Sequence, residues 1–167
     1  YEEALSLLDE LLESDPQNSR YLQARASALW SLGKEKEAAV TLDLLRRMGE
    51  LKTLELVILG DLYHNLNLYD LSLDAYVGAL ARANKLSLSQ YIRIAQTLIQ
   101  RSSYQEGFSY LEKIEKEFGD GRSKEERKLI NLLKAEVLQA TGKNKEATDL
   151  LTEIVSEHPL EGRALIQ

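Results

Sequence analysis

The residue types most able to take part in catalysis are one histidine and the carboxylate that precedes it. Asp61 and His64 are three residues apart, so a helix would place them on one face, where a carboxylate can orient an imidazole. With the hydroxyl of Ser27, they supply the residue types of a nucleophilic triad. A helix face offers neither the strained turn that exposes a nucleophile nor the donors of an oxyanion hole. We therefore predict that the chain is not an enzyme and that Asp61 and His64 are a surface pair that helps to bind a partner.

The other reactive residue types give no pattern for a metal or a cofactor. His158 has no second histidine at ligand spacing, and the chain contains no cysteine, which excludes disulfides, thiolate nucleophiles and cysteine zinc sites. No glycine-rich phosphate loop follows a strand. The sequence therefore predicts no catalytic residue, no cofactor and no metal.

Composition limits the remaining classes of function. The 167 residues suffice for one well-buried domain. The formal net charge of −6 argues against the strongly basic face that nucleic acid requires. No apolar run approaches the roughly 18 residues of a spanning helix, so we predict no direct membrane insertion. Only 9 glycines and 2 prolines are present, which favours long helices joined by short turns.

A repeat is the main organising signal. A small residue followed four places later by a large apolar residue recurs along the chain. The small residues lie at positions 4, 38, 72, 107 and 147, at intervals of 34, 34, 35 and 40 residues. A period of 34 residues is that of a helix–turn–helix repeat.

Local motifs agree with this period. Leu59-Gly60 with Tyr63 reproduces a Leu-Gly-x-x-Tyr element, with Leu56 where a tryptophan is usual, and Asp15-Pro16 and His158-Pro159 match a closing proline. On these residues, the chain resembles the tetratricopeptide repeat family over nearly its whole length. The resemblance implies an all-α fold, a right-handed α-α superhelix, or solenoid, of antiparallel helix hairpins.

The repeat register divides the chain as a single array over residues 1–167. We expect the second helix of a preceding repeat in the first segment, four repeats in the next four, and the start of a further or capping helix in the last. The segments are 1–18, then 19–52, 53–86, 88–121 and 128–161, and then 162–167. The start at mid-hairpin, without an initiator methionine, predicts that the chain is part of a longer repeat or multidomain protein.

Small residues at fixed repeat positions are expected to let paired helices approach closely, among them Gly60 and Ala38. The wide last interval predicts an insertion around Gly119–Arg122, after which Ser123 and Glu126 form a capping box and open a longer first helix. The insertion is either an individual structural feature or a variable loop of the kind that repeats tolerate.

In the family, the first helix of each hairpin lines the concave groove, and the resemblance carries that role to matching positions here. The implied groove residues are Arg20, Gln23, Ser27, Trp30, Val57, Asp61, His64, Asn65, Ile92, Arg93, Gln96 and Gln100. They mix apolar, amide and charged side chains, which suits an extended or helical peptide. The family clamps a C-terminal carboxylate with a Lys and an Asn at positions 5 and 9 of one repeat, and this pair is absent here. Those positions hold Gln23 and Ser27, Val57 and Asp61, Ile92 and Gln96, and Leu132 and Glu136.

The sequence therefore predicts a protein-protein interaction scaffold that binds a partner protein or peptide in the groove. Trp30, the only tryptophan, is either a binding anchor or packs under the neighbouring turn. Two alternatives stay open: a structural segment that self-associates as a homo-oligomer through exposed solenoid ends, and a regulatory accessory domain of a larger enzyme.

Overall fold

The computed structural model describes residues 1–83 and 86–157 of the chain, and the predicted features at His158-Pro159 and 162–167 lie outside the described residues. The chain divides into two compact units, Tyr1–Leu86 and Ser87–Gln167. All the regular secondary structure in the described residues is helical, in agreement with the predicted all-α class.

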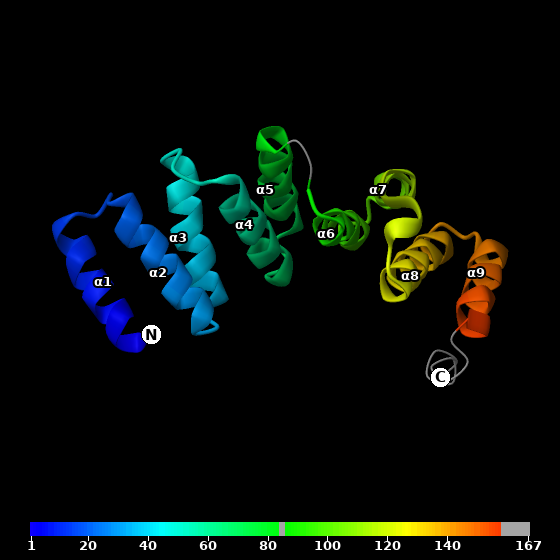
Figure 1. The fold of residues 1–167 in the computed structure, drawn as a ribbon, viewed down its shortest axis with the longest axis horizontal. Helices are drawn as coiled ribbons and strands as arrows, with labels where there is room; N and C mark the ends of the chain where they lie inside the picture. The colour runs from blue at the N-terminus through cyan, green and yellow to red at the C-terminus, as the bar shows by residue number, and fades with distance from the viewer. Residues whose placement is uncertain (84–85, 158–167) are drawn as a thin grey trace. The chain divides into compact units, whose positions relative to one another are not determined.

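Unit 1 holds five helices (Figure 1). They are α1 (Glu2–Ser14), α2 (Ser19–Ser31), α3 (Glu35–Arg47), α4 (Thr53–Asn65) and α5 (Tyr69–Arg82). α2 pairs with α3 and α4 pairs with α5 as antiparallel hairpins, while α1 packs on α2 and α3 packs on α4. Each hairpin therefore buries one side against the next, as a stacked repeat requires.

Unit 2 contains two more hairpins, separated by a short 3₁₀ turn. Its elements are α6 (Leu88–Gln100), α7 (Tyr104–Phe118), η1 (Gly119–Gly121), α8 (Lys124–Ala140) and α9 (Asn144–Glu157). α6 pairs with α7 and α8 pairs with α9, and α7 and α6 both contact α8. The predicted ranges 19–52, 53–86 and 88–121 each enclose one hairpin, but the grouping of all hairpins into one array stays a prediction.

The four hairpin turns share one conformation. In each, a residue with positive φ follows the first helix: Gly33 (70°), Asn67 (60°), Ser102 (65°) and Gly142 (78°). The next amide donates back to a carbonyl in the last turn of that helix, for example Lys34 N to Leu29 O at 2.9 Å. This bond satisfies a carbonyl that the helix end would otherwise leave unpaired.

The small residues of the repeat bring the helices of each pair into close contact. Gly60 of α4 lies against the ring of Tyr76, which is 1% exposed. Ser72 Oγ donates to Gly60 O at 2.8 Å, and Tyr76 Oη donates to Asp61 Oδ1 at 2.5 Å. A larger side chain at position 60 would separate α4 from α5, so the prediction of a packing role for Gly60 is confirmed.

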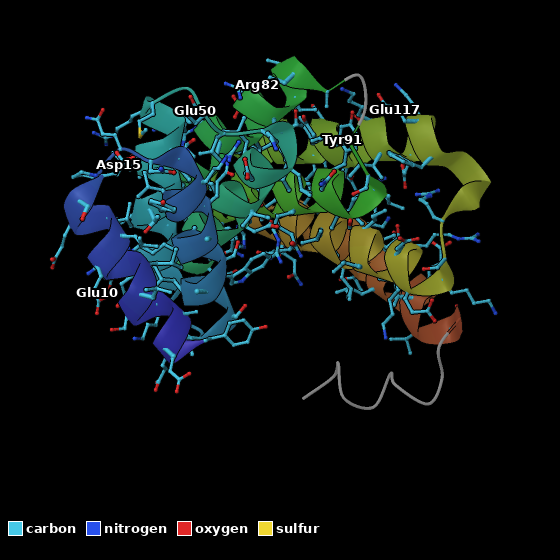
Figure 2. All side chains as sticks on the ribbon, turned by 60° about the vertical axis from the view of Figure 1, so that its left-hand side comes forward. Glu10, Asp15, Glu50, Arg82, Tyr91 and Glu117 are labelled. Atoms are coloured by element: carbon cyan, nitrogen blue, oxygen red, sulfur yellow. The ribbon has the colours of Figure 1, made fainter. Side chains whose placement is uncertain are left out.

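Arg82, at the end of α5, connects this helix to the segment between α3 and α4. Figure 2 labels Arg82. Its guanidinium donates to the carbonyl of Leu51, which is buried. In unit 2, the ring of Tyr91 on α6 lies 5.7 Å from that of Phe118 and 6.0 Å from that of Tyr110, both on α7. Polar contacts and aromatic contacts therefore supplement the aliphatic core of the hairpins.

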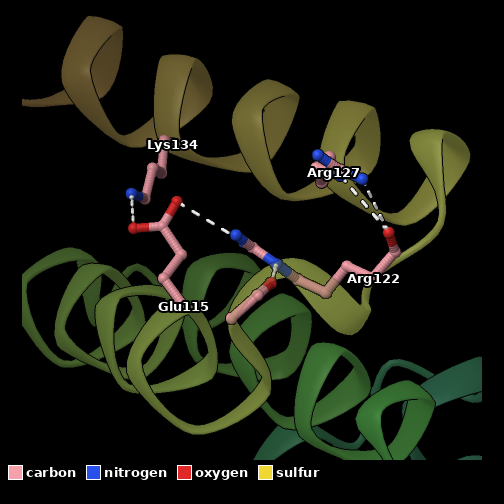
Figure 3. Close-up of polar contacts among 5 residues, drawn as sticks. Glu115, Arg122, Arg127 and Lys134 are labelled. Atoms are coloured by element: carbon pink, nitrogen blue, oxygen red, sulfur yellow. Dashed lines mark hydrogen bonds and ion pairs between the residues drawn. The ribbon is translucent and has the colours of Figure 1, made fainter.

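The insertion between α7 and α8 is held by charged side chains (Figure 3). Glu115 of α7 accepts from Lys134 Nζ of α8 at 2.6 Å and lies 3.7 Å from Arg122 Nη1. Arg122 Nε donates to Gly119 O at 2.7 Å, and Arg127 donates to Arg122 O. The predicted capping box is confirmed: Ser123 Oγ accepts from Glu126 N at 3.1 Å, and α8 begins at the next residue.

Candidate functional site

The predicted groove residues lie on the first helix of their hairpins, in both units. In unit 1, α2 carries four of them and α4 carries another four. They are Arg20, Gln23, Ser27 and Trp30 on α2, and Val57, Asp61, His64 and Asn65 on α4. In unit 2, α6 carries Ile92, Arg93, Gln96 and Gln100. Each unit therefore presents its own set.

Three of these residues meet in one small pocket of unit 1. Gln23, Ser27 and Trp30 line a pocket of about 70 Å³ together with residues of α3 and α4. Trp30 remains 48% exposed, so about half of the indole is open to a partner. The pocket thus combines an accessible aromatic ring with an amide and a hydroxyl.

The sequence did not identify two residues of the same pocket, Glu55 and Ile58 of α4. Ile58 follows the predicted groove residue Val57 directly, Glu55 lies two residues before it, and both help to line the pocket next to Trp30 on α2. The signal that could have found them is their place on the first helix, combined with the stacking of successive hairpins. Glu55 adds a carboxylate, which also accepts from the Lys52 amide at 2.7 Å.

Two predicted groove residues are instead part of the core. The side chains of Val57 and Ile92 are each only 5% exposed, so they offer almost no surface to a partner. Both are apolar and branched at Cβ, and burial of such a side chain stabilises the fold. Their assignment as groove residues is therefore corrected.

The residues with triad chemistry are engaged in contacts that hold the fold together. Ser27 Oγ donates to Gln23 O of its own helix at 3.0 Å. Asp61 accepts from the Tyr76 hydroxyl, and the His64 ring packs edge-on to Tyr69 at 5.6 Å. The hydrogen bond of Asp61 and the ring contact of His64 both connect α4 to α5.

The remaining predicted residues are at least partly accessible. Asn65 Nδ2 donates to Glu35 Oε1 at 3.1 Å and is exposed. Arg20 and Gln100 are exposed, while Arg93 and Gln96 are half-buried. Part of each side chain is therefore exposed at the surface of its unit.

A charged cluster lies on α3, the second helix of the hairpin that begins with α2. Asp43 of α3 accepts from Arg46 Nε and Arg47 Nε, both at 2.8 Å. Burial raises the pKa of Asp43, but hydrogen bonds from Arg46, Arg47 and Tyr63 outweigh it and hold the pKa below its usual value. Burial, together with the Asp43 charge and hydrogen bond, raises the pKa of Tyr63 to about 12.

Comparison with known proteins supports the fold but not a specific relationship. No family model and no curated protein matches the sequence. Among solved structures, MamA from Desulfovibrio magneticus RS-1 superposes with a TM-score of 0.67 and 17% identity, over 93% of this chain and 84% of that one. Kinesin light chain TPR-like repeats from Podosopora anserina give 0.66 and 18%, over 93% and 85%.

A third similar structure, YrrB, is described as a TPR protein with an unusual peptide-binding site. It superposes with a TM-score of 0.63 at 15% identity, over 91% of this chain and 75% of that chain. The chain folds as a tetratricopeptide repeat protein. This confirms the all-α fold of stacked antiparallel hairpins that the resemblance implied.

The described residues contain no cluster of side chains that could bind a metal ion. Among residues 1–83 and 86–157, no three His, Cys, Asp or Glu side chains gather in a way that could hold a metal ion. In the same residues, no helix has both the length and the apolar character needed to cross a membrane.

Proposed function

We propose that the chain binds a segment of another protein through the first helices of its hairpins, with the Trp30 pocket as the anchor site of unit 1. Trp30 carries the argument, because a large aromatic ring stays half exposed at a pocket. Tryptophan is enriched among the residues that dominate binding energy at interfaces. An apolar side chain of the partner would pack on the indole.

The polar groups of the pocket suit recognition of a peptide backbone. Gln23 offers an amide with both donors and acceptors, and Glu55 offers carboxylate oxygens. Such groups orient an extended or helical segment, while the apolar anchor supplies affinity. In unit 2, Arg93, Gln96 and Gln100 are proposed to provide polar contacts of the same kind.

The test compares the parent chain with Trp30→Ala in a pull-down from a lysate of the source organism, followed by calorimetry with the captured protein. We expect the variant to bind that protein about thirtyfold more weakly or worse, since truncation of a dominant interface residue costs about 2 kcal/mol or more. Gln23→Ala should weaken binding less, because an exposed neutral hydrogen bond contributes about 1 kcal/mol.

Val77→Ala is the matched control, since Val77 is 62% exposed but lies on the second helix α5. It should leave the affinity unchanged. If Trp30→Ala retained the parent's affinity for every captured protein, the proposed site would be wrong.

A further inference from the structure

A shallow crevice opens on unit 1 between α3 and the turn from α4 to α5, away from the Trp30 pocket. Its volume is about 490 Å³, and none of its lining residues belongs to the Trp30 pocket. α3 forms one wall, and Tyr63, Leu66 and Leu68 form the other. The proposed function makes no use of this surface.

Three large apolar side chains around the crevice are exposed. Val40 and Leu44 are 66% and 42% exposed, and Leu68 across from them is 45% exposed. Val40 and Leu44 are one turn apart and therefore share one face of α3. Single exposed apolar residues are common, but three around one depression indicate a surface that excludes water when a partner covers it.

The charges at the crevice are mainly positive. Lys36 and Arg47 line its two ends, at the first and last turns of α3. Asp43, the lining carboxylate, is already paired with Arg46 and Arg47. The Arg47 side chain is still 75% exposed. A local cationic rim on a chain of net charge −6 favours a partner that brings carboxylates.

The same place in unit 2 shows that the fold itself creates the depression. A crevice of about 430 Å³ lies between α7 and the end of α8. Its Gln105 and Ser109 occupy the repeat positions of Lys36 and Val40. The unit 2 crevice therefore has neutral polar residues in place of Lys36 and Val40, while its own cation, Lys143, stands at the repeat position of Leu68. The combination of charge and apolar surface in the unit 1 crevice thus comes from its side chains.

We propose that this crevice, defined by Lys36, Val40, Leu44, Arg47 and Leu68, docks an amphipathic helix of a partner protein with two apolar residues one turn apart and an acidic residue beyond each. The apolar pair covers Val40, Leu44 and Leu68, and the two carboxylates meet Lys36 and Arg47. A helix laid against a groove in this way presents anchors at the spacing of one turn.

Charge argues against a second copy of this chain as the occupant. In a twofold antiparallel pairing of two α3 helices, Lys36 of one copy would face Arg47 of the other, and in a parallel pairing like residues would meet. Both arrangements place cations together beside a desolvated apolar patch, which is unfavourable. A partner with acidic flanks has no such conflict.

The test uses two synthetic alanine-rich helical peptides of about 14 residues, a length at which isolated helices become marginally stable. Both carry two leucines four residues apart, flanked by glutamates in one peptide and by lysines in the other. We expect the full chain to bind the glutamate peptide by fluorescence anisotropy, and the lysine peptide about tenfold more weakly or not at all. Lys36→Glu with Arg47→Glu should reverse this preference.

Two further variants keep the result interpretable. Val40→Gln with Leu44→Gln retains the rim charges and good helix formers, and it should abolish binding of the glutamate peptide. Gln105→Glu with Lys116→Glu changes charge at the equivalent positions of unit 2 and should leave binding as in the parent. Circular dichroism of each variant should match that of the parent.

Three outcomes would overturn the proposal. They are no binding of either peptide, equal binding of both, and binding that survives the Val40 and Leu44 substitutions. Light scattering addresses the remaining occupant: a dimer of the parent chain that Val40→Gln with Leu44→Gln dissociates would assign the crevice to a second copy instead.

Discussion

Gly60 lies in the middle of α4 with the Tyr76 ring directly against its backbone. A Cβ at this position would lie 2.6 Å from Tyr76 Cε1 and 2.8 Å from Cδ1. The ring is fully enclosed and its hydroxyl is bonded to Asp61, so it has little room to move. We expect Gly60→Ala to destabilise the chain by about 1–2 kcal/mol, because overpacking outweighs the gain in helix propensity.

Gly78 in α5 provides the matched control for this prediction. A Cβ there would meet Leu56 Cδ1 at 3.7 Å, an ordinary van der Waals contact. Gly78→Ala should therefore stabilise the chain by about 0.5–1 kcal/mol through helix propensity alone. Urea unfolding of both variants measures the two effects, and a stabilising Gly60→Ala would contradict the packing argument.

Tyr63 gives the stability of unit 1 a dependence on alkaline pH. Its pKa in the folded chain is about 12, above the ordinary value of 10.0, so folding favours the protonated phenol. Its contribution is therefore complete below pH 10 and is lost as the pH rises from 10 to 12. We expect Tyr63→Phe to reduce the alkaline loss of stability measured by urea unfolding over this range.

Tyr1→Phe, which removes an exposed tyrosine, serves as the comparison for that measurement. The ultraviolet absorbance of tyrosinate gives a second readout, because the portion that titrates late should shrink in Tyr63→Phe. An unchanged late portion would show that the pKa of Tyr63 is not raised in the folded chain.

At the scale of single elements, the hairpin turns use one backbone conformation with different residues. Gly33 and Gly142 occupy the left-handed position in two turns, whereas Asn67 and Ser102 occupy it in the others. A side chain in this conformation costs about 1 kcal/mol, and the cost is smaller for Asn than for other residues with a side chain. We expect Ser102→Gly to raise the free energy of unfolding by about 0.5–1 kcal/mol.

The converse change is Gly142→Ala. Apart from Gly142 and its two chain neighbours, no heavy atom lies within 4 Å of the added Cβ, so the expected loss of about 1 kcal/mol comes from backbone conformation alone. Thermal unfolding followed by circular dichroism would measure both variants. A neutral Gly142→Ala would mean that this turn relaxes at no cost.

The helices and turns could be predicted because their signals are local. The repeat spacing predicts the hairpins, and Ser123 with Glu126 predicts the start of α8. Gly33 and Gly142 stand at two of the left-handed turn positions, where glycine is the usual residue. Asn67 and Ser102 give a weaker turn signal, since neither is the usual residue for that conformation. Local patterns thus determine where each element begins and ends.

The candidate site could be predicted only in part, because it depends on contacts between elements far apart in the sequence. The repeat position predicts Gln23, Ser27 and Trp30 together, and the structure gathers them in one pocket. The burial of Val57 and Ile92 follows from what packs against them, which no spacing within their own helix encodes. The unit 1 crevice likewise arises where α3 meets the turn from α4 to α5.

At the scale of the whole molecule, stability should be distributed over the hairpins, because each hairpin of a repeat protein contacts only its neighbours. Ile114 on α7 and Leu45 on α3 are both fully buried, and they belong to different units. Each substitution by alanine should cost about 2–5 kcal/mol through lost burial and a cavity. The two variants are therefore expected to lose a comparable amount of stability, Leu45→Ala in unit 1 and Ile114→Ala in unit 2.

Amide hydrogen exchange should reveal where each loss is felt. We expect Ile114→Ala to speed exchange mainly in α6 to α9 and Leu45→Ala to speed it mainly in α1 to α5, because local openings follow local packing. One part of a repeat array can open before another when the coupling between neighbouring hairpins is weak compared with the stability that each part gains from its own core. Equal acceleration throughout the chain in both variants would show instead that the hairpins open as one cooperative body.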